Sequence, residues 1–183
     1  MAWPERLAAV APERLVFLDE SGAKTDLTRL YGRASGGKRV VDAAPRGHWC
    51  TTTVLSSIRL DGSTAAMVVD GPTDGEVFGV YVDQVLVPSL RPGDIVVMDN
   101  LAPHKMVRVV AAMEAAGAAV WYLPPYSPDL NLIEKMWSKV KAYLRRVQAR
   151  TREALWRAIG AALKTVTGTD AANWFRSCGY CYE

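Results

Sequence analysis

The run DIVVMDN at residues 94–100 constrains the fold of this chain most strongly. Four consecutive apolar residues between two acids are typical of a short strand that is buried on both faces. Such a strand needs helices on both sides of its sheet, which favours an α/β architecture. The run RLVFLDE at 14–20 also ends in acid, and AVWYL at 119–123 predicts a third strand of this kind.

An antiparallel pair of strands is expected between the first two runs. WCTTTVLSSIRL (49–60) is rich in threonine and valine, and STAAMVVDG (63–71) follows it after Asp61-Gly62, a dipeptide typical of hairpin turns. TDLTRLYGR (25–33) predicts an additional strand before this pair.

Helices are expected where capping residues precede apolar residues at 3.6-residue spacing. Four segments qualify: one after the capping-box pair Thr73 and Glu76, one from Pro103 to Gly117, one from Ser127 and Pro128 to about Arg150, and one from about Thr151. Antiparallel strands come first and strand–helix–strand crossovers follow. The sequence therefore predicts an α/β fold with a mixed sheet and helices on its faces.

The bulk properties of the chain exclude several classes of protein. At 183 residues it has the size of one domain, and no apolar run is long enough to span a bilayer. Charges interrupt residues 1–15, so no signal peptide is expected. The net charge of +3 permits a nucleic-acid partner without requiring one.

The three cysteines favour free thiols in the cytoplasm, because the count is odd and no secretory signal is present. Cys178 and Cys181 form a C-x-x-C, but a zinc site needs two more ligands. His48 and His104 are both far away in the sequence. A metal or redox role for the pair is therefore not favoured.

Acidic residues follow two of the expected strands. Asp19 ends the first run and Asp99 ends the run at 94–100. Ligands of α/β sheets gather beyond the carboxyl ends of strands, so the two carboxylates converge if their strands are neighbours. A third acid, Glu134, lies at the border of the apolar stripe of the helix after Ser127.

Polar residues at three- and four-residue intervals share the helix face of Glu134: Asn131, Ser138, Lys141 and Arg145. An acid followed by two cations suits a site that holds a metal ion and then nucleic-acid phosphates. Three carboxylates in one place repel one another, and a hard cation with a preference for oxygen ligands, such as Mg²⁺, removes that conflict. Two such ions about 3.5–4 Å apart stabilise the attacking and leaving oxygens of a phosphodiester.

Each of these features alone has a simpler explanation. An acid after a strand often only starts a loop, and Glu134 by itself fits a first-turn acid that the helix dipole favours. His104 by itself fits a helix-start residue, and the basic residues of this region fit a solvated surface. The combination, rather than any single residue, favours a metal-dependent site.

Five motifs together resemble the catalytic domain of insertion-sequence transposases related to Tc1/mariner, in the DDE transposase and integrase superfamily. They are VFLDESG, YGRASGGKR, GHW, DIVVMDNLAPHK and LPPYSPDLNLIEKMWSKVK. Thirty-four residues separate Asp99 from Glu134, which is the spacing that gives this group its D-34-E name. The resemblance extends from Arg14 to the terminal WFRSCGY.

The resemblance implies a ribonuclease H-like fold with a five-stranded mixed sheet flanked by helices. It implies that Asp19, Asp99 and Glu134 are catalytic and bind two Mg²⁺ or Mn²⁺ ions. The enzyme would cut DNA at the transposon ends, and the freed 3′-hydroxyl would attack target DNA. It would act as a homo-oligomer on DNA, in the cytoplasm and associated with the nucleoid.

Two further groups of residues carry expectations. Asn100, His104 and Asn131 match motif positions and are expected to position the acids. Contacts with DNA are expected from Lys105, Lys141, Arg145 and Arg146.

The sequence departs from the family pattern in two places. Leu132 stands where the family usually has proline, and leucine is compatible with a helix. No helix-turn-helix domain fits before the first expected strand, so residues 1–183 are expected to form one catalytic domain, with a separate helix-turn-helix chain as a possible partner.

Two other functions stay open. One is a catalytically silent or domesticated DNA-binding remnant of a transposase. The other is a Mg²⁺-dependent phosphatase of the haloacid dehalogenase type, which also uses acids at strand ends. The motif of that family is D-x-D after the first strand, and Asp19-Glu20-Ser21 lacks the second aspartate.

Overall fold

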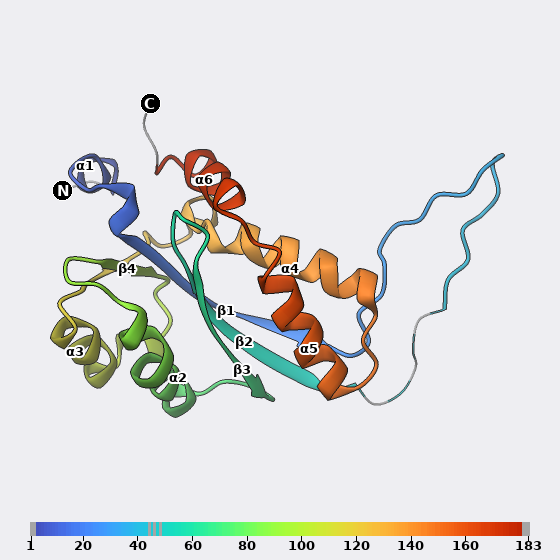
Figure 1. Cartoon of the computed structure of the whole chain (residues 1–183), viewed down its shortest axis with the longest axis horizontal. Coiled ribbons are helices and arrows are strands. Elements are labelled where there is room, and N and C mark those ends of the chain that lie inside the picture. The colour runs from blue at the N-terminus through green and yellow to red at the C-terminus, as the bar shows by residue number, and fades with distance from the viewer. Residues whose placement is uncertain (1–2, 44, 46, 48, 181–183) are drawn as a thin grey trace.

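The computed structural model describes residues 3–43, 45, 47 and 49–180. Its five strands form one sheet in the order β3-β2-β1-β4-β5 (Figure 1). They are β1 (Leu15–Lys24), β2 (Thr51–Ile58), β3 (Thr64–Asp70), β4 (Ile95–Met98) and β5 (Ala119–Tyr122). The first three are antiparallel, whereas β4 and β5 run parallel to β1. The predicted α/β fold with a five-stranded mixed sheet is confirmed.

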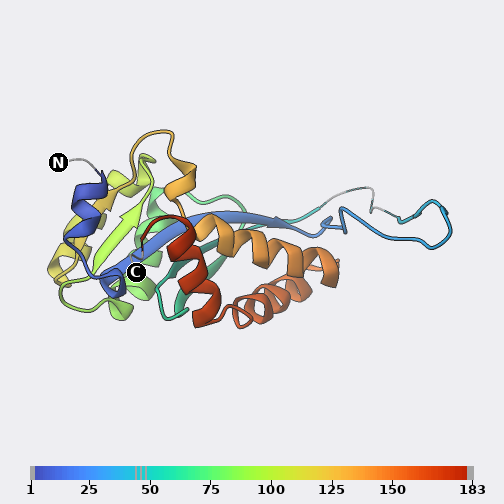
Figure 2. The ribbon, with the colours of Figure 1, turned by 90° about the horizontal axis from the view of Figure 1, so that it is seen from above.

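Helices cover both faces of this sheet, as the fully apolar strand β4 between β1 and β5 requires (Figures 1 and 2). The helices are α1 (Trp3–Ala8), α2 (Gly75–Tyr81), which continues as a π-helical segment (Val82–Leu86), α3 (Val107–Ala115), α4 (Ile133–Val147), α5 (Arg152–Leu163) and α6 (Gly168–Ser177). Among the described residues, no helix has the length and apolarity needed to cross a membrane.

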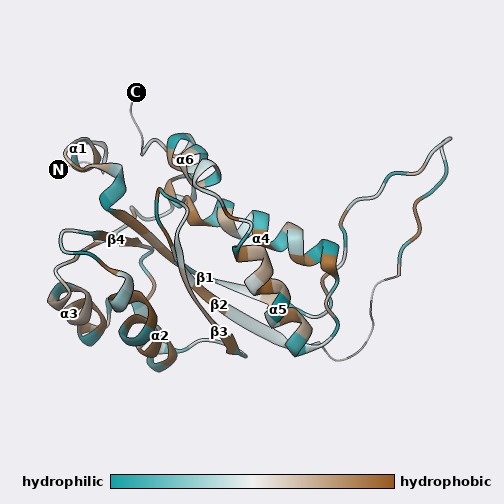
Figure 3. Cartoon of the chain, in the orientation of Figure 1, coloured by the Kyte–Doolittle hydropathy of each residue, from teal (hydrophilic) through white to brown (hydrophobic). Residues whose placement is uncertain are grey.

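The side chains of β1 alternate between two hydrophobic cores. Leu15 and Phe17 belong to the core under α4, α5 and α6, while Val16 and Leu18 belong to the core under α2 and α3. Colouring by hydropathy shows β4 apolar along its length, whereas α4 alternates between polar and apolar residues (Figure 3). The sheet is therefore a rigid middle layer that holds residues at its strand ends in fixed places.

The prediction of a strand at residues 25–33 is wrong. The chain instead extends β1 to Lys24, which pairs with Thr51 of β2. The residues that follow leave the body of the domain as a projecting segment (Figures 1 and 2). Leu30 and Tyr31 are exposed there and have no neighbouring strand to cover them.

The helix that carries Glu134 begins later than the capping pattern predicts. Ser127 and Pro128 start a 3₁₀ turn (Pro128–Leu130), and the Ser127 hydroxyl donates to the carbonyl of Pro125 instead of capping a helix. The α-helix α4 starts at Ile133, with Leu132 and Ile133 fully buried. It ends at Val147 rather than Arg150, because Gln148 adopts a left-handed conformation. The two buried side chains, not a cap, determine where α4 starts.

Other helix starts also differ from the predicted ones. Asp74, not Thr73, caps α2, since its carboxylate accepts from the backbone N–H groups of Glu76 and Val77. Pro103 opens a short 3₁₀ turn, and α3 follows from Val107.

Helix α6 is an additional element at the C-terminal end. Thr167 and Asp170 form a reciprocal capping box at its start. Phe175 of α6 packs edge-on against Phe17 of β1, with ring centroids 5.5 Å apart. The buried Tyr180 then donates from its hydroxyl to the carbonyl of Leu130, 2.7 Å away. The C-terminal segment therefore fixes the turn that leads into α4.

Candidate active site

Strand pairing brings Asp19 and Asp99 together. The parallel register of β1 and β4 ends at the pair Phe17 and Val97, and two more residues along both strands place Asp19 beside Asp99. The assumption that these strands are neighbours is thus confirmed. Asp19 itself does not end β1, because the antiparallel ladder continues past it and pairs it with Ser56 of β2.

Helix α4 crosses this point and forms a cleft of about 400 Å³ with β1. The cleft is lined by Asp19, Glu20, Ser21, Glu134, Trp137, Ser138, Lys141 and Arg145. The acids come from β1 and the first turn of α4, whereas the cations lie two and three turns further along the helix. One wall of the cleft is therefore formed by four of the residues predicted on one helix face, Glu134, Ser138, Lys141 and Arg145, and the charge along it changes from negative to positive. Asn131, predicted on the same face, precedes α4 and does not line the cleft.

The Asp19 carboxylate is held from the side of α4. The indole N–H of Trp137 donates to Asp19 Oδ2 at 3.2 Å, and Trp137 is only 5% exposed. Burial raises the pKa of Asp19 to about 6, and the nearby charges of Asp99 and Glu20 add to this rise. The ionised form of Asp19 is therefore destabilised in the folded protein, and a cation bound in the cleft would stabilise it.

A buried histidine lies between the neighbouring acids. His104 Nδ1 is 2.7 Å from Asp99 Oδ1, and His104 Nε2 is 3.5 Å from Glu20 Oε2. Neither contact meets the geometry of a hydrogen bond, so both are described as ion pairs. Burial alone would lower the pKa of His104, but the two carboxylates raise it to about 9. His104 is thus a cation at neutral pH.

Asp99 responds in the opposite direction to Asp19. Burial alone would raise its pKa, but His104 and the backbone N–H of Leu101, 3.0 Å from Oδ1, hold it below the usual range. Two neighbouring carboxylates therefore have different affinities for protons, and Asp99 stays ionised when Asp19 is partly protonated.

The remaining positions expected to support the acids lie nearby. The side-chain amide of Asn100 donates to the carbonyl of Leu123 and ties the segment after β4 to the end of β5. Asn131 is buried just before α4, and its backbone carbonyl accepts a hydrogen bond from the backbone N–H of Glu134.

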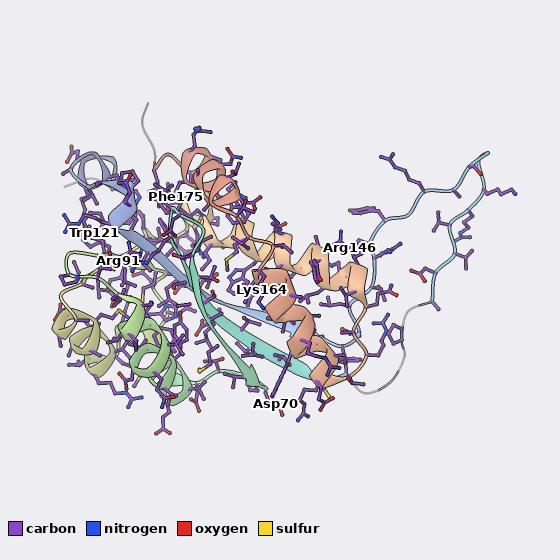
Figure 4. The ribbon with its side chains drawn as sticks, viewed as in Figure 1. Asp70, Arg91, Trp121, Arg146, Lys164 and Phe175 are labelled. Atoms are coloured by element: carbon purple, nitrogen blue, oxygen red, sulfur yellow. The ribbon has the colours of Figure 1, made fainter. Side chains whose placement is uncertain are left out.

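Two of the four cations expected to contact DNA do not line the cleft. Lys105 lies over the ring of Tyr122, with Nζ 5.6 Å from the centroid. Arg146 lies over the ring of Tyr143, 5.1 Å from the centroid, and projects from the outer part of α4 (Figure 4). Lys141 and Arg145 alone of the four share the cleft with the acids.

Metal-ligand groups are incompletely assembled in this conformation. Within the part of the chain that the structure describes, no three carboxylate, imidazole or thiol groups are arranged closely enough to hold a metal ion. Asp99 turns toward His104, and the Glu134 side chain is exposed. Cys178 is buried, while Cys181 and His48 lie outside the described residues.

Sequence reasoning did not assign Glu20, Ser21 or the indole N–H of Trp137 to the site. Glu20 and Ser21 follow Asp19 directly, so their place in β1 is the only signal that could have indicated them. Trp137 fits the apolar stripe of α4 and gives no separate signal of a polar role.

Comparison with known proteins agrees with this geometry. A family model described as DDE superfamily endonuclease matches residues 14–156. The left-end paired-end complex of Mos1 transposase superposes with a TM-score of 0.72 at 13% identity, over 94% of this chain and 55% of that one. The catalytic domain of Mos1 mariner transposase gives 0.66 at 13% identity, over 94% and 81%. The catalytic core domain of BIV integrase gives 0.53 at 16% identity, over 82% and 81%.

These likenesses confirm the ribonuclease H-like fold. No curated protein matches the chain significantly. The chain spans about half the length of the Mos1 transposase chains in the DNA complexes that it matches. Because the family model covers most of the sequence, from the first strand to α5, the chain belongs to the DDE superfamily endonucleases.

Proposed function

We propose that this chain is the catalytic domain of a transposase related to Tc1/mariner. It would hydrolyse a phosphodiester at a transposon end, with water adding to phosphorus and the 3′-oxygen leaving as a hydroxyl. That 3′-hydroxyl would then displace a 3′-oxygen in target DNA, so that one phosphodiester forms as another breaks. The cleft that joins Asp19 and Glu134 to Lys141 and Arg145 carries the proposal, since it offers acids for the reaction and cations for the strand.

Asp19, Asp99 and Glu134 are the proposed catalytic residues and the proposed ligands of two Mg²⁺ or Mn²⁺ ions. Their donor atoms are all carboxylate oxygens, which these hard ions prefer. The raised pKa of Asp19 beside Asp99 supports a site built for a cation. When bound, the ions would lower the pKa of water and stabilise the attacking and leaving oxygens.

His104 and Asn100 would position Asp99. The imidazolium of His104 would neutralise part of the charge of Asp99 and Glu20. Asn100 holds the chain after Asp99 against β5. Together they would hold this acid in place at the end of β4.

Metal-dependent nicking of supercoiled DNA tests the proposal. The wild-type chain is expected to nick with Mn²⁺ and to stop when EDTA is added. DNA binding without any nicking, in protein that is folded and metal-loaded, would instead support the catalytically silent remnant.

The basic end of the cleft gives a prediction about DNA affinity. Lys141→Ala combined with Arg145→Ala is expected to weaken DNA binding, because two phosphate contacts are lost. Each lost contact should also flatten the slope of log affinity against log salt concentration by about 0.9 on duplex DNA. Fluorescence anisotropy at several salt concentrations measures this slope.

Arg157→Ala combined with Lys164→Ala is the matched control for this prediction. It removes the same charge from exposed residues of α5 and its C-cap, which line no part of the cleft. Equal slopes for the two double variants would contradict a specific role for Lys141 and Arg145.

A further inference from the structure

A single hydrogen bond joins the strand that carries one acid to the helix that carries another. The donor is the Trp137 indole N–H on α4 and the acceptor is Asp19 Oδ2 on β1, at 3.2 Å. The two residues are 118 positions apart in the sequence. Trp137 is 5% exposed and packs in the core between the sheet and α4, so water does not compete freely for the bond.

The acceptor of this hydrogen bond is a carboxylate, whereas a buried tryptophan commonly donates to a neutral oxygen. A hydrogen bond to an ionised carboxylate is stronger and better oriented than one to a neutral oxygen. It fixes one oxygen of Asp19 and therefore the plane of the carboxylate.

The same bond sets the position of Glu134. Trp137 follows Glu134 by three residues, so the two side chains project from the same side of α4, about one turn apart. Anchoring Trp137 to Asp19 thus fixes both the height and the rotation of the first turns of α4 relative to β1. Both Trp137 and Glu134 line the cleft with Asp19.

We propose that Trp137 is a positioning residue for the metal site: its indole N–H orients the Asp19 carboxylate and aligns α4 with β1, so that Asp19 and Glu134 face the same divalent cation. This inference rests on the proposed function. Trp137 itself would touch neither the metal nor DNA.

A second indole hydrogen bond between a helix and the sheet provides a control, although its tryptophan is more exposed, 39% against 5%. The indole N–H of Trp156 on α5 donates at the same distance, 3.2 Å, to the hydroxyl of Thr52 on β2. Trp156→Phe removes one indole hydrogen bond between a helix and the sheet, as Trp137→Phe does, but its acceptor is neutral. A purely structural loss should appear in both variants.

Mn²⁺ titration of the DNA-free protein, followed by electron paramagnetic resonance of the unbound ion, tests the proposal without using activity. Trp137→Phe is expected to weaken Mn²⁺ binding about tenfold, which is the effect typical of removing a partner that orients a metal ligand. Trp156→Phe is expected to bind Mn²⁺ like the wild type. Asp19→Asn is expected to lose most of the binding.

The outcomes separate this inference from the proposed function. Equal affinities for Trp137→Phe and Trp156→Phe, with binding lost in Asp19→Asn, would overturn the role of Trp137 and leave the metal site standing. Full binding in Asp19→Asn would overturn both. Circular dichroism confirms that each variant is folded.

The unmodified protein provides a test that does not depend on any variant folding. The indole ¹H–¹⁵N resonance of Trp137, assigned by triple-resonance spectroscopy, is expected to shift and saturate during a Mg²⁺ titration, because the carboxylate that accepts its hydrogen bond would also bind the ion. The Trp156 resonance is expected to stay in place. A Trp137 resonance that is unchanged at saturating Mg²⁺ would contradict the proposal.

Discussion

Asp99→Asn and Glu134→Gln are each expected to abolish Mn²⁺-dependent nicking while leaving the fold and DNA binding intact. Each change keeps the size of the side chain but removes a charged ligand. Metal ions in such sites supply several kcal/mol of transition-state stabilisation. Since 1.36 kcal/mol corresponds to a tenfold change in rate, the loss should be about a hundredfold or more. Conversion of supercoiled to nicked plasmid measures it.

Glu153→Gln is the control for this experiment. Glu153 is an exposed acid in the first turn of α5, just as Glu134 is in the first turn of α4, but it lies outside the cleft. Its loss should leave nicking unchanged. If Asp99→Asn or Glu134→Gln also nicked like the wild type, the assignment of the acids would be wrong.

Asp19→Asn is expected to stabilise the metal-free protein while destroying its activity. The pKa of Asp19 rises from 3.8 to about 6 on folding. At 1.36 kcal/mol per pKa unit this is at most about 3 kcal/mol of lost stability at neutral pH, and partial exposure to solvent reduces it to about 1–2 kcal/mol. Asparagine removes the charge and still offers an oxygen to Trp137.

The pH dependence of this stabilisation follows from the upward direction of the Asp19 pKa shift. The folded protein binds more protons than the unfolded chain between about pH 4 and pH 6, so the wild type loses stability as pH rises through this window. The advantage of Asp19→Asn should therefore be near zero at pH 4 and complete above pH 6. Urea unfolding in EDTA at several pH values measures it.

Added Mg²⁺ provides the internal control for the stability prediction. The ion should stabilise the wild type and not Asp19→Asn, so the difference between them should shrink as Mg²⁺ is added. An Asp19→Asn protein that is less stable than the wild type at pH 7 in EDTA would show that the Asp19 carboxylate is not a source of strain.

Sequence patterns were sufficient where local physics decides the structure. The run at 94–100 predicts a buried strand, and its four apolar residues form β4, which is fully buried between β1 and β5. The convergence of Asp19 and Asp99 was conditional, because the order of strands in a sheet depends on long-range pairing that periodicity does not reveal. The family resemblance supplied the order that the pattern alone left open.

Other predictions were wrong or incomplete because tertiary contacts override local sequence signals. The pair Ser127-Pro128 has the signature of a helix start, yet burial of Leu132 and Ile133 sets the start of α4 five residues after Pro128. Leu132, which replaces the usual proline, is fully buried and so anchors the turn before Glu134. Trp137 matched the core stripe correctly, but its acceptor lies on β1, and no helix pattern identifies a partner on another element.

Anomalous diffraction from crystals soaked in Mn²⁺ tests the central claim most directly. A manganese peak is expected in the cleft, within bonding distance of carboxylate oxygens of Asp19 and Asp99, with Glu134 turned toward it and Asp99 drawn from its contact with His104. A peak that touches none of these three acids, or a cleft without manganese at saturating Mn²⁺, would contradict it.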